Sequence, residues 1–103
     1  MEGTGTGFGE AEMRRLKGEL LLNSDNSAAA EAAQSFHEAI EVARSQSAKS
    51  WELRATMSLA RLLSKQGRRE EARTMLADIY GWFTEGFDTG DLIDAKALLK
   101  ELN

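Results

Sequence analysis

Two stretches of the sequence share a pattern: residues 60–79 read ARLLSKQGRREEARTMLADI, and residues 18–39 read GELLLNSDNSAAAEAAQSFHEA. Each begins at a small residue, passes through a polar turn and reaches Glu-Ala, with apolar residues four and seven positions after that alanine. This spacing is typical of one face of an α-helix. We interpret each stretch as a helix-turn-helix unit, repeated with an offset of 40 residues in its second half and 42 in its first.

Helical periodicity extends over the rest of the chain and predicts five helices with no strand. Four of the predicted helices span about 9–22, about 50–66, about 68–84 and 90–102. The second helix in chain order is defined by a stripe of mostly small apolar residues from Ala29 to Ala43. The third has apolar residues on two sides, which predicts a helix packed between neighbours. Gly67 is expected to be a C-cap and Thr89 an N-cap. The expected apolar stripe of the last helix is Leu92, Ala95, Leu99 and Leu102.

Composition excludes several classes of site. The 103 residues include no cysteine and one histidine, so disulfides, thiolate metal sites, cysteine nucleophiles and histidine-pair metal sites are absent. No apolar run approaches the ~18 residues of a membrane span, and no signal peptide opens the chain. We therefore expect a cytoplasmic protein without metal or cofactor. Residues 1–9, MEGTGTGFG, are expected to be a flexible glycine-rich segment before a helical domain at 10–103.

The small-residue helix pairs, with Gly18, Ala32, Phe36 and Ala39 at their spacing, resemble tetratricopeptide repeats. The runs RREEAR (68–73) and YGWFTEGFDT (80–89) resemble the C-terminal segment of bacterial predicted ATPases and adenylate/guanylate cyclase-like regulatory proteins. The resemblance implies an all-α antiparallel helical solenoid of two tetratricopeptide-like repeats and a capping helix. It also implies a non-catalytic interaction or scaffold module, because no ATPase or cyclase motif is present. Relatives tend to have proline where this chain has Gly90.

A concave groove is the candidate binding site. Residues 44–73 contain eight basic and three acidic residues. The inner face of the third helix would carry Arg54, Met57, Arg61, Ser64 and Lys65, and that of the first helix Glu12, Arg15, Glu19 and Leu22. Of these, the predicted partner-binding residues are Arg15, Arg54, Met57, Arg61 and Lys65. Guanidinium forks bind carboxylates, so the expected partner is an acidic peptide or protein, such as another domain of a parent protein. The alternative is a solvated helix face. A nucleic-acid partner is not expected, because the chain is acidic overall and lacks interleaved aromatic residues.

The alternative function is that of a small enzymatic bundle, such as a histidine phosphotransfer domain around His37. Such domains typically place Lys-Gly shortly after the histidine, whereas Glu38-Ala39-Ile40 follow here, so we expect a surface histidine and no enzyme. Glu70-Glu71 and Asp88/Asp91 are interpreted as residues of helix N-termini rather than as a cation site.

Both ends of the domain carry apolar residues that need a cover. Trp82 and Phe87 are expected to be buried as part of the C-terminal cap, rather than to form an aromatic ligand cage. At the other end, apolar surface around Phe8, Met13 and Leu16 is expected to be exposed, or covered by a second copy in a homodimer.

Overall fold

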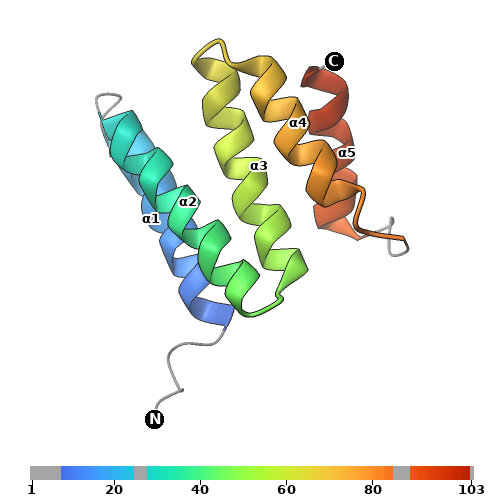
Figure 1. Cartoon of the computed structure of the whole chain (residues 1–103). Helices are drawn as coiled ribbons and strands as arrows, with labels where there is room; N and C mark the ends of the chain where they lie inside the picture. Colours follow the sequence, from blue (N-terminus) through green and yellow to red (C-terminus); the bar gives the residue numbers. More distant parts are fainter. Residues whose placement is uncertain (1–7, 25–27, 85–88, 103) are drawn as a thin grey trace.

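The structure, a computed structural model, describes residues 8–24, 28–84 and 89–102. These ranges contain five α-helices and no strand (Figure 1), which confirms the all-α prediction. The helices are α1 (Phe8–Ser24), α2 (Ala29–Ser45), α3 (Lys49–Lys65), α4 (Arg69–Tyr80) and α5 (Gly90–Leu102). α1 begins inside the glycine-rich segment predicted at 1–9, of which residues 1–7 lie outside the described ranges.

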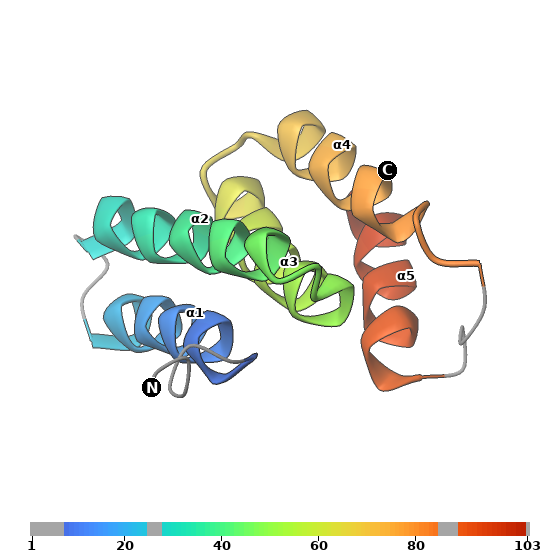
Figure 2. The ribbon, with the colours of Figure 1, turned by 60° about the horizontal axis from the view of Figure 1, so that its bottom comes forward.

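The central helix is α3, which contacts all four other helices. α1 and α2 form an antiparallel pair on one side of it, and α4 and α5 lie on the other side (Figure 1). Seen from below, α2 and α4 occupy one layer, while α1 and α5 lie in the other (Figure 2). A helix with neighbours on several sides needs more than one apolar face. Ten of the seventeen residues of α3 are buried, as its two apolar sides predicted.

The two turns that flank α3 share one geometry. Ser47 after α2 has a positive φ of 54°, and Gly67 after α3 has one of 81°. In each turn the next amide, that of Ala48 or Arg68, donates to the carbonyl five residues earlier at 2.8 Å. These contacts form Schellman motifs, in which one residue must take the left-handed conformation. The left-handed glycine predicted at the end of this helix is confirmed at Gly67, which follows the C-cap residue Gln66. Ser47 adopts the same conformation without the freedom of glycine.

Close packing in the first hairpin depends on Gly18 of α1, which is buried beneath the ring of Phe36 of α2. A Cβ atom at position 18 would lie 2.5 Å from Phe36 Cε1. In the second hairpin the matching sequence positions are Ala60 and Leu76, and both are fully buried. Compared with Gly18 and Phe36, Ala60 is larger by one methyl group and Leu76 is smaller, so the combined size at the matching positions is similar.

The C-terminal end is covered by α5, which contacts α3 and α4. Its buried residues are Leu92, Ala95, Leu98 and Leu102. The sequence prediction placed Leu99 in this stripe, but Leu99 is only partly buried and Leu98 faces the core. Adjacent leucines differ by about 100° around a helix, so packing against α3 and α4 selects one of them.

The prediction that Trp82 is a buried cap residue is wrong, because Trp82 is 57% exposed. α4 ends at Tyr80, earlier than the predicted 84, and the chain turns through Gly81. This turn carries the indole to the edge of the molecule, where the Lys49 Nζ atom lies 5.5 Å from its ring centroid. The cover of the last helices comes from α5 instead. Phe87 lies outside the described residues.

Candidate binding groove

A hollow of about 330 Å³ opens between α1, α3 and α5. Its principal lining residues are Glu19 and Leu22 of α1, Arg61, Leu62 and Lys65 of α3, and Leu98 and Glu101 of α5. We refer to this hollow as the α1–α3–α5 groove. Leucines contribute its apolar surface, and two bases and two acids contribute its charges. Such a combination suits a peptide with both charged and apolar side chains.

The structure brings two of the five predicted site residues into this groove. Arg61 and Lys65 are exposed and line it. Arg15 and Arg54 are ion-paired, as described below, and do not line the hollow. Met57 is not a groove residue either, because it is 4% exposed and belongs to the core. An apolar residue on a helix with several neighbours was drawn into the protein interior.

Arg15 and Arg54 belong to an ion-pair network that joins three helices. Arg54 Nη1 lies 3.3 Å from Glu12 Oε2 of α1, and Arg54 Nε lies 3.2 Å from Asp91 Oδ1 in the first turn of α5. Arg15 Nη2 lies 2.7 Å from Glu12 Oε2. Because these bases already have carboxylate partners, their charge is largely neutralised within the chain. The network holds the ends of α1, α3 and α5 together beside the groove.

Hydrogen bonds in the network shift two pKa values. The hydrogen bonds from Arg15 lower the pKa of Glu12 below its ordinary value of 4.5, against the opposing effect of partial burial. The positive charges of Arg15 and Arg54 lower it further. The same hydrogen bonds raise the pKa of Arg15. Both groups are therefore ionised at neutral pH, and the pair persists there.

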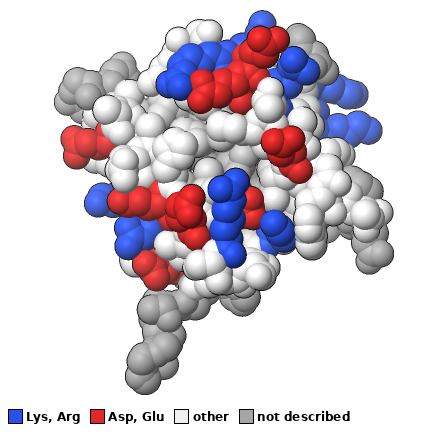
Figure 3. All heavy atoms as spheres, viewed as in Figure 1, with Lys and Arg blue, Asp and Glu red and all other residues white. Residues whose placement is uncertain are grey.

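Most other bases of the segment 44–73 are also paired. Arg44 and Lys49 bind Glu52, Arg68 binds Glu71, and Arg73 binds Glu70. On the face shown in Figure 3, basic and acidic side chains lie side by side, most densely at the end where α3 leads into α4. Within the described residues, Arg61 and Lys65 form no ion pair. The unneutralised basic charge of α3 is thus at the groove.

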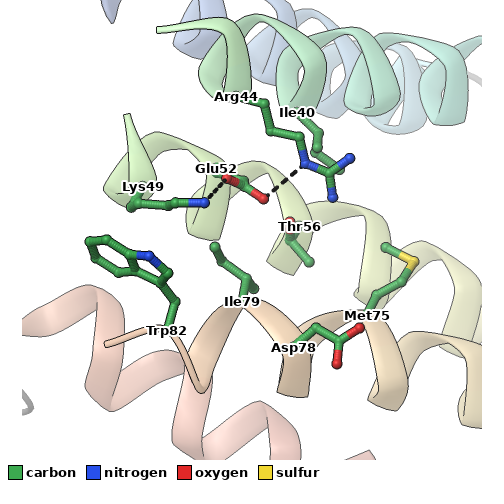
Figure 4. Close-up of a pocket in the computed structure, with 9 residues that line it drawn as sticks. All are labelled: Ile40, Arg44, Lys49, Glu52, Thr56, Met75, Asp78, Ile79 and Trp82. Atoms are coloured by element: carbon green, nitrogen blue, oxygen red, sulfur yellow. Dashed lines mark hydrogen bonds and ion pairs between the residues drawn. The ribbon is translucent and has the colours of Figure 1, made fainter. Parts of the chain in front are cut away.

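A second hollow, of about 210 Å³, lies between α2, α3 and α4 (Figure 4). The Glu52 side chain at its wall is only 6% exposed. It accepts hydrogen bonds from Arg44 Nε at 3.0 Å and from Lys49 Nζ at 3.3 Å. Removing partners from a buried carboxylate is strongly destabilising. The two bases in this hollow therefore have a structural role, which makes it a weaker candidate for binding than the groove.

Other kinds of site find no support in the described residues. His37 is exposed on α2, as the sequence predicted. No cluster of three His, Asp or Glu side chains within the described ranges could hold a metal ion. Of the helices in these ranges, none combines the length and apolar character needed to cross a lipid bilayer.

Sequence reasoning missed the contribution of α5 to the groove. Leu98 and Glu101 line it, whereas the sequence analysis treated the last helix only as a cap. A signal was present in the repeat pattern, because in the predicted solenoid a helix that follows two hairpins would take the place of the first helix of a third unit. In the structure α5 contacts α3, as α1 does.

No protein family model matches the chain, and neither a curated protein nor a solved structure matches it. The features of this chain that bear on its function are therefore the groove, its charges and the helices that build it.

Proposed function

We propose that this chain is a non-catalytic protein-interaction module whose α1–α3–α5 groove binds an acidic peptide segment. The observation that carries the proposal is the pair Arg61 and Lys65, exposed beside apolar groove residues and without an ion pair in the described part of the chain. The sequence resemblance described above suggests the partner: another domain of a bacterial ATPase or cyclase-like regulatory protein in the cytoplasm.

The proposed architecture is a tetratricopeptide-like solenoid of two helical hairpins capped by α5. Two features support it. Gly18 lies opposite Phe36 in the first hairpin, and Ala60 and Leu76, at the matching sequence positions of the second, are both fully buried. In addition, α3 contacts α1 and α2 in the way that α5 contacts α3 and α4. Stacked repeats of this kind use the concave surface lined by equivalent helices for binding, which in this chain is the row α1, α3, α5.

The chemistry of the groove favours a carboxylate ligand next to an apolar side chain. Arg61 can bind both oxygens of a carboxylate with its planar fork, and Lys65 adds a compact charge one turn further along α3. Leu22 and Leu98 offer apolar contact. Glu19 accepts a hydrogen bond from Ser58 Oγ at 2.8 Å. Together with Glu101 it repels acidic side chains of a peptide that do not lie next to Arg61 and Lys65. Exposed charge contacts are weak singly, so affinity is modest and falls as salt rises.

The test is binding of an acidic peptide library to the wild type and to the double variant Arg61→Ala/Lys65→Ala, measured by fluorescence anisotropy. Two exposed contacts of up to about 1 kcal/mol each predict a loss of affinity of roughly 5- to 30-fold. The matched control is Lys96→Ala/Lys100→Ala, which removes the same charge from exposed positions of α5 that do not line the groove. It should bind like the wild type at the same ionic strength.

Two results would contradict this function. Equal binding by the wild type and the Arg61→Ala/Lys65→Ala variant would show that these bases do not hold the ligand. Binding that does not weaken between low and high salt would show that charge does not drive recognition. Either result would mean that the chain has a purely structural role and that its groove does not bind acidic peptides.

A further inference from the structure

The outer face of α1 carries an apolar stripe that no other described part of the chain covers. Met13, Leu16 and Leu20 are 64%, 47% and 65% exposed. Their spacing of three and four residues places them in one row along the helix. The sequence analysis predicted exposure of Met13 and Leu16; the side chain of Phe8 lies outside the described residues.

The equivalent face of α3 is buried. Forty-two residues after the α1 stripe lie Ala55, Ser58 and Leu62, which are 1%, 2% and 4% exposed. This face of α3 meets the preceding hairpin, since Ser58 Oγ donates a hydrogen bond to Glu19 of α1. The face that α3 buries against its neighbour is therefore the one that α1 leaves open. A row of large apolar residues at such a place indicates an interface.

Among the described residues, the opposite end of the molecule offers no matching surface. α5 covers α3 and α4 there, and its exposed residues are mostly charged: Asp94, Lys96, Lys100 and Glu101, beside Ile93 and Ala97. Head-to-tail stacking of copies would thus set an apolar stripe against a polar helix. Within the described part of the chain, the surface that matches the α1 stripe in apolar character is the α1 stripe of a second copy, which points to two-fold pairing.

Charges beside the stripe fit such a pairing. Lys17 of α1 and Glu31 of α2 line one shallow hollow next to it, and neither forms an ion pair within the described residues. Arg14 and Glu38 nearby already pair at 2.9 Å. Lys17 also lies close enough to Glu38 to interact with it electrostatically. The face therefore presents one base and one acid that form no ion pair among the described residues, and it is complementary to itself after a two-fold rotation.

We propose that two copies of this chain associate through antiparallel α1 helices, with a two-fold axis near Leu16. Met13 of each copy then packs against Leu20 of the other, and Lys17 of each copy approaches Glu31 of the other. This interface lies apart from the residues that line the α1–α3–α5 groove, so it stands or falls independently of acidic-peptide binding.

The first test is sedimentation equilibrium across protein concentrations from about 1 μM to about 1 mM, the range in which a small interface is populated. The wild type should show a concentration-dependent doubling of mass, and Leu16→Glu should remain a monomer. The matched control is Ile93→Glu, because Ile93 is 53% exposed on the opposite end; it should dimerise like the wild type. A wild type that stays monomeric throughout overturns the proposal and assigns the stripe to another occupant, such as a further helical hairpin.

Charge-reversal and cysteine variants test the geometry. Lys17→Glu and Glu31→Lys should each weaken dimerisation, and the double variant should restore it; absence of restoration contradicts the proposed charge pairing. Because the chain has no cysteine, Leu16→Cys introduces a single thiol. Under mild oxidation this variant should form a disulfide-linked dimer and Ile93→Cys should not. Equal cross-linking of both variants would show that the contact is non-specific.

Discussion

At the scale of single residues, Gly18 determines how closely the first two helices approach. Gly18→Ala should destabilise the protein although alanine favours helix, because the added Cβ would collide with the fully buried ring of Phe36. We expect a net loss of about 1–2 kcal/mol in the free energy of unfolding, measured by urea denaturation. Gly9→Ala is the control, since a Cβ atom at position 9 of the same helix meets nothing within 4 Å. It should be neutral or slightly stabilising.

A second residue-scale prediction concerns Glu12 and acid stability. Its pKa is lower in the folded chain than the ordinary 4.5, so the folded state binds this proton less readily than the unfolded state. The resulting stabilisation is complete above the ordinary pKa and is lost as pH falls through the lowered value. Glu12→Gln should lower the free energy of unfolding at pH 7 by roughly 1–2 kcal/mol. The variant should also lose less of its stability than the wild type as the pH is lowered.

Urea denaturation between about pH 7 and about pH 3 measures this linkage. The control is Asp94→Asn, which removes a carboxylate that is exposed and has no ion pair among the described residues. Glu12→Gln and wild-type curves that run parallel through the acid range would show that the Arg15 hydrogen bonds contribute nothing to the linkage.

At the scale of elements, the matching turns around α3 differ in one residue type. Ser47 has the left-handed φ that Gly67 takes without strain, and a side chain in that conformation costs about 1 kcal/mol. Ser47→Gly should therefore raise the free energy of unfolding by about that amount, and Gly67→Ser should lower it similarly. Thermal melts of the two variants and of their double variant give the comparison. Destabilisation by Ser47→Gly would mean that the loss of the serine side chain outweighs the relief of strain.

Local pattern predicted which elements form, and tertiary contacts decided the details of the site. Arg61 and Lys65 could be placed from periodicity because they lie on one face of a long regular helix. The partner of Arg54 could not, since Asp91 is 37 residues away in the chain. Trp82 was expected in the core because it is large and apolar, but Lys49 supplies a cation over its ring and allows an exposed position. Burial and pairing depend on neighbours that sequence spacing does not identify.

At the scale of the whole molecule, α5 completes the fold. Removing residues 88–103 should expose the apolar faces that α3 and α4 now bury beneath Leu92, Leu98 and Leu102. We expect aggregation, or the loss of a cooperative thermal transition, measured by light scattering and circular dichroism. A truncated chain that remains monomeric and melts as the full chain does would show that α5 is dispensable for stability.

The contact map of the helices has a consequence for the speed of folding. Within the described ranges, each helix contacts only helices one or two places away along the chain. Little loop-closure entropy is lost when such neighbours meet, so the chain can form one hairpin and add the next helix to it in sequence. Helical proteins dominated by local contacts fold in roughly microseconds to milliseconds. A nascent chain of this kind would therefore gain its first stable hairpin before its last helix has been synthesised.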